Sequence, residues 1–311
     1  MTDHTALGPG REFDFVRALL ARWGHLAAGV GDDAALIDVP ADHRLTASMD
    51  SAVEGVHFRR DWLSPREIGW RTAAAALSDL AAMAADPIAM LVSMSVPTAW
   101  MNDVLDVADG LGDAARSAGA RIAGGDLTSA RELCIAITVL GVARAPLLRS
   151  GARAGDVLYV TGRLGGPLAA LRAWQRGAQP AEFPRERFAH PVPRLREARW
   201  LAEHGAHAAI DVSDGLLSDA AHIASASHAR LAMTLDRLPA VDNLSPDDAA
   251  RSGEEYELLV ASPHALDVSE FAQRFDIPLT EIGRVEAGDA EVVATLRGTR
   301  VAPGGGFDHF S

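Results

Sequence analysis

Hydrophobic residues in the first half of the chain follow two patterns, one with helical spacing and one of nearly continuous apolar runs. Together the two patterns predict a mixed α/β fold. Helical spacing covers Glu12–Arg22, Pro65–Ala84 and Ala99–Ala118. Strand-like runs cover Leu45–Met49, Ala89–Val96 and Leu133–Val142. Ser64 and Glu67 form a capping-box motif, which predicts that the second helix begins there.

Turn-forming residues interrupt these patterns between Arg144 and Asp156. Because 311 residues suit two domains of ordinary size, we expect an N-terminal domain of residues 1–146 and a C-terminal α/β domain of residues 147–311. Further helices are predicted at Pro167–Arg176, Val192–Glu203 and Leu216–Ser227. Further strands are predicted at Val157–Thr161, Ala208–Val212, Leu231–Leu235, Glu257–Ala261 and Glu291–Leu296.

The composition narrows the class of protein. Cys134 is the only cysteine, which excludes disulfide scaffolds and four-cysteine zinc sites and indicates a reducing compartment. No apolar run reaches the roughly 18 residues of a membrane span, and Met1–His4 does not begin a secretory signal. We therefore expect a cytoplasmic protein without a membrane partner. The formal net charge of −13 argues against nucleic acid and favours small ligands or metals.

The chain contains no lysine, so all 29 of its Lys and Arg positions are arginine. This excludes the mechanisms that need a lysine, such as the Walker A phosphate loop, the protein-kinase strand lysine and Schiff-base chemistry. A phosphate bound by this chain must be neutralised by arginine, by backbone N–H groups or by a divalent metal.

Acidic residues stand beside glycine or serine in five segments near the ends of predicted elements. The five segments are Gly31–Asp33, Ser48–Asp50, Ser78–Asp79, Gly124–Asp126 and Asp211–Gly215. Asp79 is inside an apolar helix, where an aspartate costs free energy unless it has a partner. Because Mg²⁺ prefers carboxylate and phosphate oxygens, the five segments together indicate a hard-cation site. Several Mg²⁺ ions could then supply the charge that a lysine would otherwise provide.

Three of these segments also have simpler explanations. Asp79 could lie on an exposed stripe of its helix. Gly124–Asp126, which we expect to follow a short strand, could be a plain turn rather than a phosphate-binding loop. Asp211–Gly215 lies at a strand-to-helix switch, where Ser213 or Asp214 could cap the helix instead of holding an anion or a metal.

The 11 histidines show no spacing typical of a zinc hydrolase. His57 follows seven residues after Asp50, which we expect at the end of a strand. The His57 side chain would reach the site of Asp50 if the chain between them loops back. The alternative is a histidine that is satisfied in the core or lies on the surface.

Eight short motifs follow one another in order along nearly the whole chain. They are Gly31–Ala35, Asp50–Phe58, Leu77–Pro87, Gly124–Asp126, Arg149–Gly151, Ile210–Leu216, Gly253–Leu258 and Gly306–Phe310. Together they resemble the thiamine-monophosphate kinase family, a branch of the aminoimidazole ribonucleotide synthetase-like superfamily. Members of this superfamily bind ATP without a Walker loop, which agrees with the absence of lysine.

The resemblance implies a two-domain architecture, in which the sheet of the N-terminal domain pairs with its copy across a homodimer. It also implies that ATP binds between the domains near the dimer interface. The implied reaction transfers the γ-phosphoryl group of ATP to thiamine monophosphate, giving thiamine diphosphate and ADP with the help of several Mg²⁺ ions. The acceptor phosphate is already mostly ionised at neutral pH, so no general base is needed. Positioning, with neutralisation of charge by Mg²⁺ and Arg149, would then carry the catalysis.

The resemblance assigns roles to residues by their position in the motifs. Metal association is implied for Asp33, Ser48, Met49 through its backbone, Asp50, Asp79, Asp126, Asp211 and Asp214. Contacts with ATP are implied for Gly125, Asp126, Arg149 and Ser213, and proximity to thiamine monophosphate for His57, Glu254 and Phe307. Among these residues, Asp50, Asp79 and Asp126 are expected to be catalytic.

Several positions depart from the family pattern, and they affect the substrate contacts more than the metal site. They are Met49, Ala76, Ala84, Gly166, Glu255 and Phe307.

Two other classes of function stay open. One is another enzyme of the superfamily, such as aminoimidazole ribonucleotide synthetase or selenophosphate synthetase. The other is a non-catalytic nucleotide-binding partner, against which the full set of aspartates argues.

Overall fold

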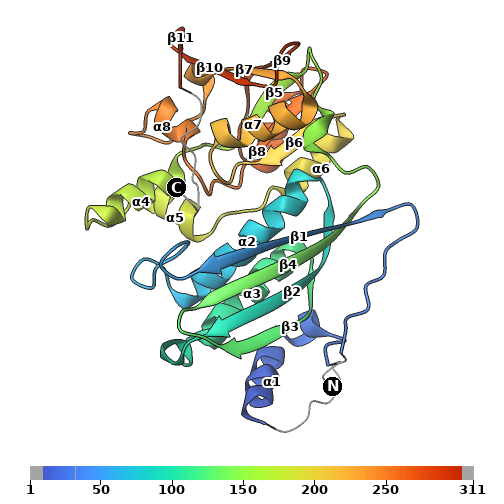
Figure 1. The fold of residues 1–311 in the computed structure, drawn as a ribbon, viewed down its shortest axis with the longest axis vertical. Coiled ribbons are helices and arrows are strands. Elements are labelled where there is room, and N and C mark those ends of the chain that lie inside the picture. The colour runs from blue at the N-terminus through green and yellow to red at the C-terminus, as the bar shows by residue number, and fades with distance from the viewer. Residues whose placement is uncertain (1–9, 32, 303–311) are drawn as a thin grey trace. The chain divides into compact units, whose positions relative to one another are not determined.

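The structure is a computed structural model that describes residues 10–31 and 33–302. The chain forms two compact units (Figure 1). One consists of Met1–Leu80 and Ala85–Ala145, and the other of Ala81–Ala84 and Pro146–Ser311. Each unit combines helices with a β-sheet, so the predicted mixed α/β class is confirmed. Among the described residues, no helix is both long enough and apolar enough to cross a membrane.

The first unit is a four-stranded sheet with helices on one face. Its elements are α1 (Arg11–Trp23), β1 (Arg44–Val53), α2 (Pro65–Ala82), β2 (Asp86–Val96), α3 (Val104–Ala118), β3 (Arg121–Ser129) and β4 (Cys134–Ala143), with 3-10 turns at Gly24–Ala27 and Thr98–Trp100. The strand order is β1-β4-β2-β3, in which β2 and β3 are parallel and the other neighbours antiparallel. Helices α2 and α3 lie against the same face of this sheet (Figure 1).

Strand β1 presents different side chains to the two faces of its sheet. The side chains at positions 46, 48, 50 and 52 are buried or half-buried, whereas those at 45, 47, 49 and 51 are exposed. This alternation is typical of a strand with one covered face. Ser48 and Asp50 therefore belong to the face covered by helices, and Met49 belongs to the outer face, where it is 62% exposed.

The second unit is built on a seven-stranded sheet with the order β11-β10-β7-β9-β5-β8-β6. Its strands are β5 (Val157–Thr161), β6 (Ala208–Asp211), β7 (Arg230–Thr234), β8 (Leu258–Ser262), β9 (Leu279–Glu286), β10 (Val292–Leu296) and β11 (Thr299–Arg300). Its helices are α4 (Gly166–Gln175), α5 (Glu182–Ala189), α6 (Leu195–Glu203), α7 (Leu216–Ser227), α8 (Pro246–Ala250) and α9 (Val268–Phe275), with 3-10 turns at Arg149–Gly151 and Leu235–Arg237. Of the neighbouring strands, only β7 and β10 are parallel.

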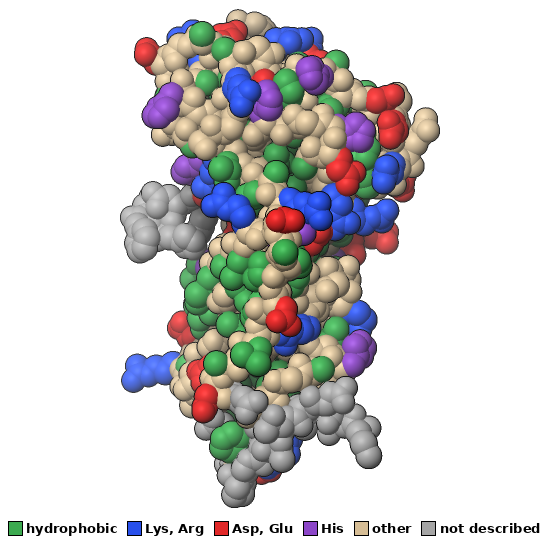
Figure 2. Space-filling view, turned by 90° about the vertical axis from the view of Figure 1, so that its right-hand side faces the viewer, with side chains coloured by type: hydrophobic (Ala, Val, Ile, Leu, Met, Phe, Trp, Pro, Cys, Tyr) green, Lys and Arg blue, Asp and Glu red, His purple; other side chains and the backbone are tan. Residues whose placement is uncertain are grey.

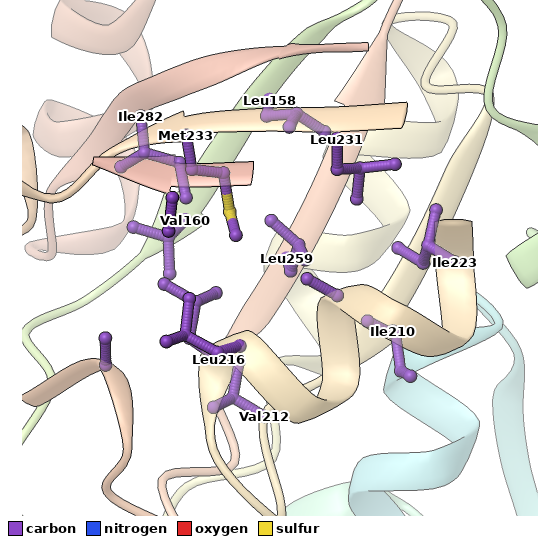
Figure 3. Packing of buried hydrophobic residues seen from close by; sticks show 14 of the residues in the cluster. Leu158, Val160, Ile210, Val212, Leu216, Ile223, Leu231, Met233, Leu259 and Ile282 are labelled. Carbon is purple, nitrogen blue, oxygen red and sulfur yellow. The ribbon is translucent and has the colours of Figure 1, made fainter. Parts of the chain in front are cut away.

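The core of the second unit has two parts, one on each face of the sheet. Leu158 and Leu259 of the strands and Leu216 of α7 belong to one cluster, and all three are fully buried (Figure 3). The neighbouring residue Tyr159 belongs to the opposite face and packs in the cluster that contains Trp200 of α6. The alternation along β5 therefore gives a strand that is buried on both faces, as its continuous apolar sequence predicts.

Most of the predicted helices and strands are present, and some of their ends differ. β5 and α7 have the predicted bounds. The capping box is confirmed, because Ser64 N–H donates to the Glu67 carboxylate at 2.8 Å and Glu67 N–H donates to the Ser64 hydroxyl at 3.3 Å. The helix predicted at Ala99–Ala118 begins only at Val104, since the buried Trp100 belongs to a separate 3-10 turn. The sequence pattern did not indicate α5, α8, α9, β9 or β11.

Two predictions about the acidic segments are wrong. Asp50 does not end its strand, because β1 pairs with β4 as far as Val53. Gly124–Asp126 does not follow a strand but lies within β3, paired with β2. In both cases the strand continues through polar residues whose backbone groups are satisfied by the neighbouring strand, so the loss of apolar character does not mark its end.

Candidate active site

Strand β1 and helix α2 bring three polar side chains of the first unit together. The Ser48 hydroxyl donates a hydrogen bond to a carboxylate oxygen of Asp79. Asp50, two residues further along the same face of β1, is close enough for the charge of Asp79 to affect it. Asp79 is half-buried and has a partner. The alternative that it lies on an exposed helix stripe is therefore wrong.

The electrostatics of this group favour a bound cation. Burial, and then the negative charge of Asp79, raises the pKa of Asp50 from 3.8 to about 6. Within the described part of the chain, neither carboxylate forms an ion pair. Half-buried carboxylates without a counter-charge repel one another, and a hard cation would relieve this repulsion.

Asp126 lies apart from these residues within one chain. The sheet register pairs Asp50 with Ile137 of β4. It pairs Val92 of β2 with both Ile137 and Gly125. Three strand spacings of about 4.8 Å thus separate Asp50 from Gly125, or about 14 Å in total. Asp126 is the next residue of β3, so its side chain points to the opposite, outer face of the sheet.

A cavity of about 1010 Å³ lies on the outer face of this sheet. Its lining includes four of the predicted site residues, namely Asp33, Met49, Gly125 and Asp126, together with apolar side chains of α1 and the strands. Gly125 has no room for a side chain, because a Cβ atom would lie 1.8 Å from the carbonyl oxygen of Val92. Close packing of β3 on β2 therefore accounts for this glycine.

The segment after β1 folds back onto the end of the strand. Val53 N–H donates to Nδ1 of His57 at 3.1 Å. Because Nδ1 accepts this bond, a neutral imidazole carries its proton on Nε2. The segment is anchored by Glu54, which accepts a hydrogen bond from the Trp100 indole N–H at 2.8 Å. The chain loops back as expected, but His57 meets the end of β1, three residues beyond Asp50.

In the second unit, the loop between β6 and α7 supplies its own anion. The backbone N–H groups of residues 213–215 all donate to one oxygen of Asp219, at 3.1, 3.2 and 3.0 Å. The amides that could bind a phosphate are thus occupied by a carboxylate of the same chain. The N-cap residue of α7 is Gly215. The alternative in which Ser213 or Asp214 caps the helix is therefore wrong.

The same loop gathers negative charge. Burial, followed by the charges of Asp211 and Asp214, raises the pKa of Asp219 from 3.8 to about 7. Asp219 is only 2% exposed. Because Asp219 already binds the amides, the loop offers carboxylate oxygens rather than N–H groups to a ligand. This suits a cation better than an anion.

Glu254 lies on a segment that is bonded to this loop. Glu254 N–H donates to the carbonyl oxygen of Ser213 at 2.6 Å, and Tyr256 N–H donates to that of Val212 at 2.9 Å. Glu254, which is predicted to lie near thiamine monophosphate, and Ser213, which is predicted to contact ATP, are therefore joined by a backbone hydrogen bond.

Arg149 is at the opposite end of α7 from Ser213. Its carbonyl oxygen accepts a hydrogen bond from the Ser227 hydroxyl, at the C-terminal end of α7, at 2.7 Å. The 12 residues of this helix span about 18 Å. Within one unit, the two residues predicted to bind ATP are therefore well separated, and the exposed Arg149 side chain is free to extend.

The predicted metal residues fall into separate groups. In residues 10–31 and 33–302, no three His, Cys, Asp or Glu side chains converge closely enough to hold a metal ion. The groups are Ser48, Asp50 and Asp79; then Asp33, Met49 and Asp126 around the cavity; and in the second unit Asp211 and Asp214. Phe307 lies outside the described residues.

Sequence reasoning missed Asp219, which shapes the loop of the second unit. A signal was present, because Asp219 is an acidic residue in the first turn of a helix that was predicted correctly. Acidic side chains in this turn commonly reach back to the N–H groups before the helix.

Comparisons with known proteins identify the family and the fold of this chain. The chain matches the AIR synthase related protein family, with the N-terminal domain at residues 31–143 and the C-terminal domain at residues 153–295. It is 37% identical over 271 residues to thiamine-monophosphate kinase of Mycobacterium tuberculosis (strain CDC 1551 / Oshkosh), which covers 85% of this chain and 81% of that protein. The chain belongs to the thiamine-monophosphate kinase family.

Solved structures of this family have the same fold. Thiamine-monophosphate kinase from Stenotrophomonas maltophilia K279a is 33% identical with a TM-score of 0.80, covering 95% of this chain and 98% of that chain. A structure described as AaThiL complexed with AMPPCP and TMP is 26% identical with a TM-score of 0.77, covering 98% of this chain and 100% of that chain. The two-domain architecture implied by the family resemblance is thereby confirmed.

Proposed function

We propose that this chain transfers the γ-phosphoryl group of ATP to thiamine monophosphate, giving thiamine diphosphate and ADP. The observation that carries the proposal is the pair Asp50 and Asp79, two half-buried carboxylates that form no ion pair with any described residue, in a member of this family. A relative of the same fold is complexed with AMPPCP and TMP, which supports ATP as the phosphoryl donor.

The oxygen donors of the chain fit Mg²⁺. Ser48, Asp50 and Asp79 offer a hydroxyl and two carboxylates. Asp211 and Asp214 offer two more carboxylates, because Asp219 takes the N–H groups of their loop. The remaining assignments to the metal set are Asp33, the backbone of Met49, and Asp126. Bound Mg²⁺ would neutralise the charge of two phosphate-bearing substrates.

The substrate contacts remain as proposed from the family motifs. The residues proposed to contact ATP are Gly125, Asp126, Arg149 and Ser213. The residues proposed to lie near thiamine monophosphate are His57, Glu254 and Phe307. The exposed guanidinium of Arg149 suits a phosphate group. With Nδ1 of His57 accepting from Val53, the proton of a neutral ring is on Nε2.

The catalytic residues would act by position and charge rather than by moving a proton. The attacking phosphate oxygen is already ionised at neutral pH, so no general base is required. Asp50 has a pKa of about 6 and is mostly ionised at neutral pH as well. The role proposed for Asp50, Asp79 and Asp126 is therefore to hold cations where the charges of the two substrates meet.

The position of Asp126 supports a homodimer with a shared site. Asp126 is about 14 Å from Asp50 along the sheet and on the opposite face, so one chain cannot bring the two together. The outer face of the first unit also exposes Leu45 and Met49, and Figure 2 shows hydrophobic side chains gathered on the surface of this unit. A second copy packed there would place Asp126 at the interface between the two chains, against the outer face of the partner's sheet.

In this proposal, residues 1–146 form the ATP-binding, Mg²⁺-binding and dimerisation domain. Residues 147–311 form the C-terminal α/β domain that contributes Arg149, Ser213 and Glu254. A cytoplasmic location, expected from the single cysteine, is part of the same proposal.

The first experiment tests the reaction itself. Purified protein is incubated with ATP, Mg²⁺ and thiamine monophosphate, and thiamine diphosphate is measured by chromatography. We expect product only when both enzyme and metal are present, because the carboxylates alone cannot neutralise the substrates. ATP binding without thiamine diphosphate would contradict the proposal and favour another superfamily substrate or a binding role.

A second experiment tests the shared site. Asp79→Asn and Asp126→Asn are each expected to be inactive. Mixed after dissociation and reassociation, they should regain about a quarter of wild-type activity, because half the dimers are mixed and each has one intact site. No recovery, with mixed dimers verified by mass spectrometry, would show that Asp79 and Asp126 act within one subunit.

A further inference from the structure

The second unit contains a buried ion-pair cluster that the proposed chemistry does not use. Glu257 is fully buried and accepts hydrogen bonds from Arg194 at 2.5 and 2.8 Å and from the Thr161 hydroxyl at 2.7 Å. Arg187 is 2.9 Å from the same carboxylate, and both arginines are less than a tenth exposed. Buried ion pairs add little net stability compared with apolar packing, so the cluster calls for another role.

Arg187 makes two contacts with Glu255 that Arg194 does not make, the weaker of which is an ion pair of 3.8 Å with its carboxyl group. Nη2 of Arg187 also donates to the main-chain carbonyl oxygen of Glu255 at 2.6 Å. The other acidic neighbour of Arg194 is Glu197 of α6, at 3.7 Å. Arg187 therefore holds the main chain of the segment that precedes β8, whereas the acidic partners of Arg194 are the side chains of Glu257 and Glu197.

The segment held by Arg187 has an unfavourable backbone conformation. Glu254 and Tyr256 have φ values of 59° and 52°. Residues other than glycine keep this left-handed conformation only when the surrounding contacts enforce it. Glu255, which lies between them, is anchored twice, since its carboxyl group accepts Gly165 N–H at 2.5 Å and its carbonyl oxygen accepts from Arg187.

The same segment is fitted closely to the loop that contains Ser213. Glu254 N–H donates to the carbonyl oxygen of Ser213 at 2.6 Å. A Cβ atom on Gly253 would lie 2.8 Å from that oxygen, so the two main chains have no space between them. A shift of the Glu254 segment would therefore move the Ser213 loop as well.

We propose that Arg187 is a positioning residue for phosphoryl transfer. By holding the carbonyl group of Glu255, it keeps Glu254 in its left-handed conformation and fixes Glu254 against Ser213. The binding positions of thiamine monophosphate and ATP are thereby linked through the backbone. This inference rests on the proposed assignment of thiamine monophosphate to Glu254 and of ATP to Ser213.

The test compares Arg187→Met with the matched control Arg194→Met. Both changes remove a buried arginine from Glu257, but only the first releases the Glu255 carbonyl group and removes the positive charge 3.8 Å from the Glu255 carboxyl group. We expect Arg187→Met to raise KM for thiamine monophosphate about ten-fold with a smaller change in kcat, because binding geometry is lost before chemistry. Arg194→Met should destabilise the protein at least as much and change KM less than about two-fold.

A second variant applies if Arg187→Met does not fold. In Gly166→Ala every charge is kept, but the new Cβ atom would lie 2.8 Å from Cβ of Arg187 and push this side chain away. We expect KM for thiamine monophosphate to rise in Gly166→Ala as well, by a smaller factor than in Arg187→Met.

A readout without turnover separates this inference from the proposed function. Hydrogen exchange of residues 252–257, followed by mass spectrometry, should become faster in Arg187→Met and stay unchanged in Arg194→Met. Equal exchange, or KM changes that follow thermal stability in both variants, would overturn the positioning role. A wild-type protein that makes no thiamine diphosphate would overturn the proposed function, while the exchange measurement would still test the hold of Arg187 on the segment.

Discussion

Two groups of buried carboxylates, one in each unit, are neutralised in different ways. In the first unit, Asp50 of β1 and Asp79 of α2 lie close to Ser48, and neither forms an ion pair with any described residue. In the second unit, Glu257 is paired with Arg187 and Arg194. The two groups differ in whether the chain itself provides the counter-charge.

The difference appears in the pKa values of the two groups. Burial and the charge of Asp79 raise the pKa of Asp50 to about 6. Burial would also raise the pKa of Glu257, but the two arginines reverse this and lower it below the usual value. A carboxylate that is satisfied by the folded chain supports structure, whereas one that is left without a counter-charge is suited to a ligand.

The largest effect is expected for Asp79→Asn. The change removes a proposed metal ligand, so kcat should fall at least about 1000-fold. It also removes the repulsion on Asp50, so the free energy of unfolding should stay the same or increase. Steady-state kinetics and urea denaturation of the same preparation test both statements. Near-normal activity with unchanged Mg²⁺ dependence would contradict the assignment.

Glu257→Gln is expected to have the opposite profile. It leaves two buried arginines without their shared counter-charge, which should lower the free energy of unfolding by about 3 kcal/mol or more. Glu286→Gln, an exposed position in β9, serves as the control for loss of one carboxylate. If both variants have the same urea midpoint, the cluster does not contribute to stability as described.

At pH 5 the smallest effect is expected for Glu255→Gln, and this effect depends on pH. Burial raises the pKa of Glu255 from 4.5 to about 8, with Arg187 opposing this. The folded chain therefore keeps a proton that the unfolded chain loses above pH 4.5. The stability contributed by this group is complete below pH 4.5 and declines as the pH rises toward 8.

Glutamine cannot lose that proton, so the variant should gain stability relative to wild type as the pH rises. The gain is limited to about 1.4 kcal/mol per pH unit, the value for one proton. Urea denaturation of both proteins at pH 5, 6.5 and 8 measures the difference. Parallel pH dependence of the two proteins would mean that Glu255 is ionised in the folded state.

The sequence predicted those features that depend on neighbouring residues in the chain. The apolar helix around Asp79 indicated that this aspartate has a partner, and the first-turn acid Asp219 was visible though unused. The partner Ser48 could not be identified, because it depends on how β1 lies against α2. The place of Asp126 depends on a shift in register between β2 and β3 near Met90, which no pattern in the sequence records.

The sequence also did not predict that Arg187 and Arg194 would pair with Glu257. Arg187 belongs to Glu182–Ala189, a short and strongly charged segment that has the composition of an exposed helix or loop. Its partner Glu257 is 70 residues further along the chain. Burial of the side chain is decided by the packing of α5 in the second unit, and local composition does not encode this.

Strand β1 shows how little tolerance the site has for error during folding. Ser48 and Asp50 lie on one face and Met49 on the other. A slip of one residue against β4 would exchange the two sets, turning Met49 toward α2 and both polar side chains outward. The proposed cation-binding group therefore does not exist in a partly folded chain, and capture of metal by this group would report that the β1–β4 pairing has reached its native register.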